Sequence, residues 1–182
     1  PGVDEDGARV DPEVIRKIAQ LRAQVRESFG KVVTALMALP RYRHQSLADL
    51  QHLVLDPLIR DRVAIAYPAG KETSEPVDIS GLAIWASVSE EVDAKIREQI
   101  RSGTWPLRLT SDDWASGEIN WLIDVIAPNK KTAASVIGNF KQVVKLGELR
   151  MHPIVGRLVD RDVLEKLGAR SRNGAGEAPN EE

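Results

Sequence analysis

A single carboxylate, Asp124, interrupts an apolar stretch that otherwise has the composition of a buried strand. The other residues between Trp121 and Ile126 are all aromatic or aliphatic. A carboxylate that is stripped of water in such a strand costs several kcal/mol unless it is ion-paired or hydrogen-bonded. We therefore expect a polar partner close to Asp124, and a histidine is the partner that we predict.

Composition narrows the classes of protein that this chain can belong to. Its 182 residues, 42% of them hydrophobic, suit one well-buried domain and are too few for two. A formal charge of -2 argues against a general nucleic-acid binder. The lack of cysteine excludes thiol catalysis, disulfides and cysteine-ligated zinc, and no histidine and aspartate set has tight metal-ligand spacing. Without a signal peptide or an apolar run of about 18 residues, we expect a cytoplasmic protein with no stable membrane insertion.

Both ends of the chain lack the apolar residues that a packed segment needs. Residues 1–11 are acidic and contain glycine, and residues 168–182 are small, polar and charged. Neither segment can bury enough apolar surface to offset the entropy that is lost on folding. We therefore predict disordered tails at 1–11 and 168–182 around a single domain at 12–167.

Hydrophobic periodicity predicts a long amphipathic helix near the N-terminus. Apolar residues recur at helical spacing from Val14 to Met37, and Pro12 fits the first turn of a helix. The helix is either continuous or broken near Gly30, and it ends before Pro40.

The rest of the domain alternates between predicted helices and strands. A capping box formed by Ser46 and Asp49 opens a short helix that runs to residue 55 and that Pro57 ends. The later elements are strands at 62–67 and 77–85 joined by a turn at 71–76, a helix at 90–101 capped by Ser87 or Ser89, a strand at 119–126, a helix at 132–144, strands at 148–152 and 154–159, and a helix at 161–167. This order predicts an α/β (α+β) fold in which helices cover a mixed sheet.

The strand around Asp124 is part of a longer motif between residues 113 and 128. It resembles the pattern Asp-Trp-x-Ser-Gly-x-x-x-Trp-x-Ile-Asp-x-Ile-Ala-Pro of the toxin-activating lysine acyltransferases, which fatty-acylate RTX protoxins of the haemolysin and cyclolysin type. The residues that fit the pattern are Asp113, Trp114, Ser116, Gly117, Trp121, Ile123, Asp124, Ile126, Ala127 and Pro128. The resemblance implies a GNAT-like acyltransferase fold and a protein-lysine fatty acyltransferase activity.

Other segments between about residues 29 and 159 are similar to the same family. They are Phe29-Gly30-Lys31-Val32 followed by Pro40 and His44, Pro57-Leu58-Ile59-Arg60, Pro76-Val77 with Trp85-Ala86, and Arg150. The chain departs from the family pattern Ser-Pro-x-His, because it has Leu39-Pro40-Arg41-Tyr42-Arg43-His44 with a longer spacer before the histidine. It also lacks a clear match to an asparagine that often follows the histidine. These departures suggest a divergent branch with a different protein substrate.

The resemblance implies that His44 and Asp124 are the catalytic residues. A histidine can take the proton of the attacking lysine amine, and a carboxylate bonded to its other nitrogen fixes the tautomer and stabilises the imidazolium. The sequence leaves a covalent acyl-enzyme open. We favour direct transfer, because the chain has no cysteine and no obvious serine elbow. The other histidines, His52 and His152, are interpreted as structural or exposed.

Basic and aromatic side chains make up the predicted binding site for the substrate and the acyl donor. They are Arg41, Arg43, Arg60, Trp121 and Arg150. Positive charge at the entrance would steer an acidic acyl carrier protein, whose 4'-phosphopantetheine thioester is the donor that we expect. Acyl-CoA ranks second, because no Gly-rich pyrophosphate loop precedes the helix at 132–144. No permanently bound cofactor and no metal is expected.

Two further function classes stay open at this point. A non-catalytic escort of a secreted RTX protein would keep the same fold, and a GNAT-type enzyme acting on a metabolite amine would need the pyrophosphate loop. The partners that we expect are an acyl carrier protein and an RTX-type protoxin or related secreted protein, with no nucleic acid. Members of the family form dimers, and the long N-terminal helix has more apolar positions than one face of a small sheet needs. We therefore expect a homodimer.

Overall fold

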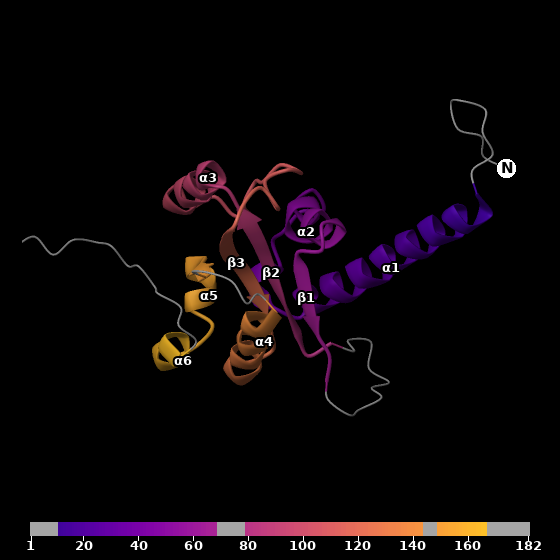
Figure 1. Ribbon diagram of the computed structural model, residues 1–182. Helices are drawn as coiled ribbons and strands as arrows, with labels where there is room; N and C mark the ends of the chain where they lie inside the picture. Colours follow the sequence, from indigo (N-terminus) through magenta and orange to yellow (C-terminus); the bar gives the residue numbers. More distant parts are fainter. Residues whose placement is uncertain (1–10, 69–78, 144–148, 167–182) are drawn as a thin grey trace, which may run out of the picture.

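A computed structural model describes residues 11–68, 79–143 and 149–166 of the chain (Figure 1). The predicted tails and the predicted hairpin turn at 71–76 lie outside these residues, apart from Asp11. Asp11 caps the first helix, because its Oδ1 accepts a hydrogen bond of 2.8 Å from the backbone N–H of Glu13.

A four-stranded mixed sheet forms the centre of the molecule. Its strands are β1 (Val63–Ala66), β2 (Gly81–Val88), β3 (Ile119–Ile126) and β4 (Leu149–Met151). Their order in the sheet is β1-β2-β3-β4, with antiparallel pairing of β1 with β2 and of β2 with β3, and parallel pairing of β3 with β4. The predicted α/β class, the hairpin and the bounds of the Asp124 strand are thereby confirmed. β2 begins four residues later than predicted and extends to Val88.

Helices cover both faces of this sheet (Figure 1). They are α1 (Pro12–Met37), α2 (Asp56–Ile59), α3 (Glu90–Arg101), α4 (Lys130–Val143), α5 (Pro153–Gly156) and α6 (Arg161–Lys166), with a 3₁₀ turn η1 (Pro40–Tyr42) and a π-helical turn η2 (Gln51–Leu55). The last turns of α1, η2 and α3 pack on one face, and α4, α5 and α6 pack on the other. Each face of the sheet therefore has its own apolar core, which is why β3 is apolar almost throughout.

The N-terminal helix is continuous through Gly30. Only its last turns are buried, at Val32, Ala35 and Leu36. The first half projects away from the sheet (Figure 1) and leaves apolar side chains exposed. The sequence left open one continuous amphipathic helix or two helices broken near Gly30, and the continuous helix is the one that forms.

Two local predictions are wrong, and a proline is involved in both. The helical segment that Ser46 and Asp49 cap does not end at Pro57: η2 leads directly into α2, and Pro57 lies in the first turn of α2, where its missing N–H is tolerated. Residues 154–159 form no strand. Pro153 instead begins the short helix α5, whose N-terminal Ile154 N–H donates to Nδ1 of His152.

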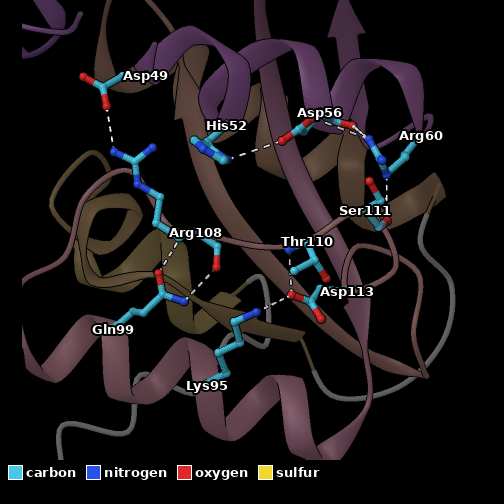
Figure 2. Close-up of polar contacts among 10 residues, drawn as sticks. All are labelled: Asp49, His52, Asp56, Arg60, Lys95, Gln99, Arg108, Thr110, Ser111 and Asp113. Carbon is cyan, nitrogen blue, oxygen red and sulfur yellow. Dashed lines mark hydrogen bonds and ion pairs between the residues drawn. The ribbon is translucent and has the colours of Figure 1, made fainter.

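The segment that begins the family-like motif is anchored on the end of β2. Oγ of Ser116 accepts a hydrogen bond from the backbone N–H of Ser89 at 2.9 Å, and the Gly117 N–H donates to the Ser87 carbonyl at 3.2 Å. Asp113 accepts from Lys95 and from the backbone N–H of Thr110 (Figure 2). These contacts give Asp113, Ser116 and Gly117 a structural role in holding this loop against the sheet.

Gly117→Ala is expected to destabilise the fold by about 1–3 kcal/mol. A Cβ at this position would lie 2.6 Å from the carbonyl oxygen of Val88 and 2.7 Å from the backbone of Ser89, and neither group can move freely. Gly30→Ala is the matched control, because a Cβ there meets nothing within 4 Å, and alanine should stabilise the helix interior by about 0.5–1 kcal/mol. Urea denaturation of both variants checks this, and equal effects of the two changes would contradict it.

Candidate active site

A β-bulge in β3 determines which way Asp124 faces. Ile84 pairs with Asp124, and the next residue of β2, Trp85, pairs with Leu122, so that Ile123 has no partner across the strand pair. An extra residue of this kind moves the following side chains to the other face of a sheet. Ile123 and Asp124 therefore both face the layer formed by α1, η1 and η2, whereas Leu122 and Val125 belong to the α4 side.

Asp124 is fully buried and its carboxylate receives three donors. Oδ1 accepts a hydrogen bond from Nη2 of Arg41 at 2.9 Å and one from the backbone N–H of Val125 at 2.8 Å. Oδ2 accepts a hydrogen bond from the hydroxyl of Tyr42. The same Nη2 of Arg41 also donates to the Val125 carbonyl at 2.6 Å. The prediction that the buried carboxylate has polar partners is therefore confirmed.

Those partners are not the predicted histidine. His44 is exposed and forms no hydrogen bond or ion pair with another described residue, so the predicted direct bond between His44 and Asp124 is wrong. The cause is local geometry: the tight turn η1 directs Arg41 and Tyr42 inward, and His44 follows after the turn has ended. In the pattern Ser-Pro-x-His, the histidine stands two residues after the proline. In this chain the residue two positions after Pro40 is Tyr42. The spacing of the pattern therefore indicates Tyr42, and not His44, as the residue near Asp124.

Burial governs the ionisation of this cluster. Loss of water raises the pKa of Asp124 to about 6, and the Arg41 guanidinium and the Tyr42 hydroxyl oppose that rise. Burial and the neighbouring Asp124 charge raise the pKa of Tyr42 well above its usual value. Tyr42 therefore stays protonated and acts as a donor. Neither residue is a general base that an incoming amine can reach.

A small cavity lies against Asp124. Its volume of about 10 Å³ is close to the least that holds one water-sized group. Its walls are His52, Leu53, Ile84, Trp105, Pro106, Leu107, Trp114, Ile123 and Asp124. Nε1 of Trp114 is buried and has no acceptor among the described residues. The cavity is too small for an acyl chain, and it can take a single polar atom beside otherwise apolar walls.

His52 joins this cavity to a second carboxylate, Asp56. Nδ1 of His52 lies 3.3 Å from Oδ2 of Asp56, a contact whose angle falls short of a well-aligned hydrogen bond. Arg60 contacts the same residue through its Nη1, at 3.0 Å from the Asp56 carbonyl and 3.7 Å from Oδ1, and its Nε donates to the Ser111 carbonyl (Figure 2). Arg60, predicted to bind substrate, is thus held by Asp56 and Ser111, beside the contact between His52 and Asp56.

The other predicted binding residues lie at a different place. Trp121 donates from Nε1 to Oδ1 of Asp93 at 2.8 Å, and Arg150 and Arg97 form ion pairs with the same carboxylate. Asp93 is 2% exposed, and these partners outweigh the effect of its burial and hold its pKa below the usual value. An open cleft of about 360 Å³ lies beside it. Sequence reasoning missed Asp93, because an acidic residue in the first turn of a helix is ordinary.

The remaining candidates are peripheral. Arg43 is exposed and forms no ion pair with another described residue. His152 caps α5, and its ring lies 4.9 Å from that of Trp105; burial lowers its pKa to about 4. Within residues 11–68, 79–143 and 149–166, no group of three metal-ligating side chains converges. No helix in those segments has the length and apolar character of a membrane span.

The molecule is a mixed sheet with helices on both faces and a buried carboxylate on a bulged central strand. This architecture fits an α+β acyltransferase fold. A sequence model of the RTX toxin acyltransferase family matches residues 21–154, which is well over half of the chain. The chain therefore belongs to the RTX toxin acyltransferase family. A search of curated protein sequences gave no match.

Proposed function

We propose that this protein moves a fatty acyl group from an acyl carrier protein to an internal lysine of an RTX-type protoxin or a related secreted protein. Membership of the acyltransferase family supports the reaction class. The observation that carries the proposal is the Asp124 centre, a buried ion pair beside a cavity on the strand with the family motif. A buried carboxylate of this kind costs stability, and active sites are where such a cost is retained. A GNAT-like fold and a cytoplasmic reaction belong to the same proposal.

The cleft beside Asp93 supports an anionic donor. Its walls include Arg97, Arg101 and Arg150 together with the carboxylates of Glu90 and Asp93. Arg101 is largely exposed, and its only ion pair in the described chain is with Glu98 on its own helix, so it can exchange that partner for a phosphate. The phosphate of a phosphopantetheine arm and the acidic surface of a carrier protein both suit this edge of the molecule.

Transfer to an acceptor protein tests the proposal directly. The purified chain is incubated with myristoyl-loaded acyl carrier protein and an RTX-type protoxin, and the protoxin is followed by intact-mass spectrometry and peptide mapping. We expect the mass of one or more acyl groups on lysine. A parallel incubation with myristoyl-CoA distinguishes the acyl-CoA alternative. Unmodified protoxin in both incubations would overturn the proposal.

An escort that binds the protoxin without acylating it is the second candidate. The specific observation in its favour is that Asp124 contacts Tyr42 and Arg41 and no imidazole. A chain that had lost catalysis could keep such a cluster as a structural ion pair. Stable binding of the unmodified protoxin, with no transfer from either donor, is the outcome that this reading requires.

We further propose a homodimer that the projecting half of α1 holds together. Val14, Ile15, Ile18 and Leu21 are between 42% and 61% exposed, and Val14, Ile18, Leu21 and Val25 recur at the alternating spacing of four and three residues that is typical of paired helices. An apolar stripe of this kind on a helix that leaves its own domain suits the same stripe of a second copy.

Leu21→Glu is therefore expected to convert a dimer into a monomer at micromolar concentration. Ala23→Glu is the matched control, because it adds the same charge on the opposite face of α1 and should leave the mass unchanged. Light scattering coupled to size exclusion measures both. A monomeric wild-type chain, or equal behaviour of the two variants, would refute this arrangement.

A further inference from the structure

We infer that His52, rather than His44, is the imidazole that takes the proton of the attacking amine, and that it works from the cavity that it shares with Asp124. The inference rests on the proposed function, since it assigns a catalytic residue to that reaction. It departs from the sequence interpretation, in which His44 has this role and His52 is structural or exposed.

None of the residues that contact Asp124 can act as the general base that takes the proton of the attacking amine. Tyr42 stands at the position of the histidine in Ser-Pro-x-His, and its hydroxyl donates to Asp124. Arg41 is a cation and cannot accept a proton. The base must therefore come from another residue that reaches the same cavity.

Only three histidines are present in the chain, and the structure separates them clearly. His44 is exposed and forms no hydrogen bond or ion pair with Arg41, Tyr42 or Asp124. Nδ1 of His152 is already the acceptor that caps α5. His52 is the one that lines the cavity together with Asp124, and its side chain is 26% exposed, so the ring touches both the cavity and the solvent side.

A carboxylate lies beside one of the two nitrogens of the His52 ring. Asp56, one turn further along, contacts Nδ1 and leaves Nε2 as the nitrogen that can exchange a proton (Figure 2). His52 lies in η2, the π-helical turn Gln51–Leu55. Turns of this type are rare and occur frequently at functional sites.

A second observation points to a ligand at the same place. Trp114 is 2% exposed and lines the cavity, and its Nε1–H has no acceptor among the described residues. Buried donors without a partner are rare in folded proteins and need a reason. An oxygen-sized group fits the cavity, and the carbonyl oxygen of the acyl thioester is an acceptor of that size.

The step balances with these groups alone. The lysine nitrogen, as a neutral amine, attacks the thioester carbonyl carbon, so that a C–N bond forms while the C–S bond breaks. Nε2 of His52 takes one proton from that nitrogen and passes it to the leaving sulfur. The products are an amide on the lysine and the free thiol of the donor, and His52 returns to its neutral form.

The test compares four chains in the transfer assay with myristoyl-loaded acyl carrier protein and protoxin. His52→Ala should lower kcat by about 100-fold or more, with the KM for the carrier protein unchanged. His44→Ala should keep activity within about threefold, which is the discriminating comparison. Gln51→Ala is the matched control, because Gln51 is exposed in the same π-helical turn and should behave as wild type.

Folding is followed by thermal melting of every variant. If His52→Ala does not fold, His52→Gln keeps the volume and a polar tip, and it should lose activity to the same extent. Full activity in a folded His52 variant, or a loss confined to His44→Ala, would overturn the inference and leave the proposed function standing. A wild-type chain that transfers no acyl group would overturn both.

Discussion

Asp124→Asn is expected to lower acyl transfer by about 100-fold or more while the protein still folds. All three contacts of this carboxylate come from donors: Nη2 of Arg41, the hydroxyl of Tyr42 and the Val125 N–H. An amide of the same size must turn its own NH₂ group toward at least one of them. Arg41 then loses its counter-charge, and the wall of the cavity that faces His52 shifts.

The measurement is the rate of lysine acylation by mass spectrometry, beside circular dichroism to show that the sheet is retained. Arg43→Gln is a suitable control for a general loss of positive charge, because Arg43 is exposed and its side chain forms no hydrogen bond or ion pair with another described residue. Wild-type rates in Asp124→Asn would show that the buried pair is structural only.

The same variant has a second signature in the dependence of stability on pH. Burial raises the pKa of Asp124 to about 6 from a usual value of 3.8, so the folded chain binds this proton more readily than the unfolded chain. The contribution of this proton to the free energy of unfolding is fully present below about pH 4. It is lost as the pH rises through about 6, and the loss is about 3 kcal/mol. The amide in the Asp124→Asn variant does not take up such a proton. Urea denaturation at several pH values should show the two curves diverging between these limits, and parallel curves would contradict the assignment.

Much of the fold was predictable from the sequence, because its periodic segments bury their apolar residues in the way that their spacing indicates. β3 and α3 have the predicted bounds, and α1 is continuous. The burial of Asp124 followed from its neighbours alone. These properties depend on residues that are close in sequence, which is the range over which hydrophobic patterns carry information.

The parts of the site that could not be predicted depend on one extra residue in a regular element. The bulge at Ile123 changes which face Asp124 occupies, and no propensity scale marks it. The π-helical turn that contains His52 likewise lies within a sequence that has an ordinary helical pattern. The side-chain partners of Asp124, Arg41 and Tyr42, are more than 80 residues away from it in sequence. Only the folded chain brings them to the carboxylate.

Asp93→Ala is expected to cost about 3–5 kcal/mol of stability, a larger loss than that expected for Gly117→Ala. Asp93 is 2% exposed and holds Nε1 of Trp121, Arg150 and Arg97, so it ties α3 to β3 and β4. Its removal leaves the half-buried Arg150 without its counter-charge and the indole N–H of a buried tryptophan without an acceptor.

Glu91→Ala is the matched control for Asp93→Ala. Both acids lie in the first turn of α3, so both substitutions remove the same favourable interaction with the helix dipole, but Glu91 is exposed. The control should change stability by no more than about 0.5 kcal/mol. Urea midpoints of the two variants separate the dipole effect from the buried network. Equal losses would mean that Asp93 acts only as a helix-end charge, and that Arg150 and Trp121 do not need it to stay in place beside the arginine-lined cleft.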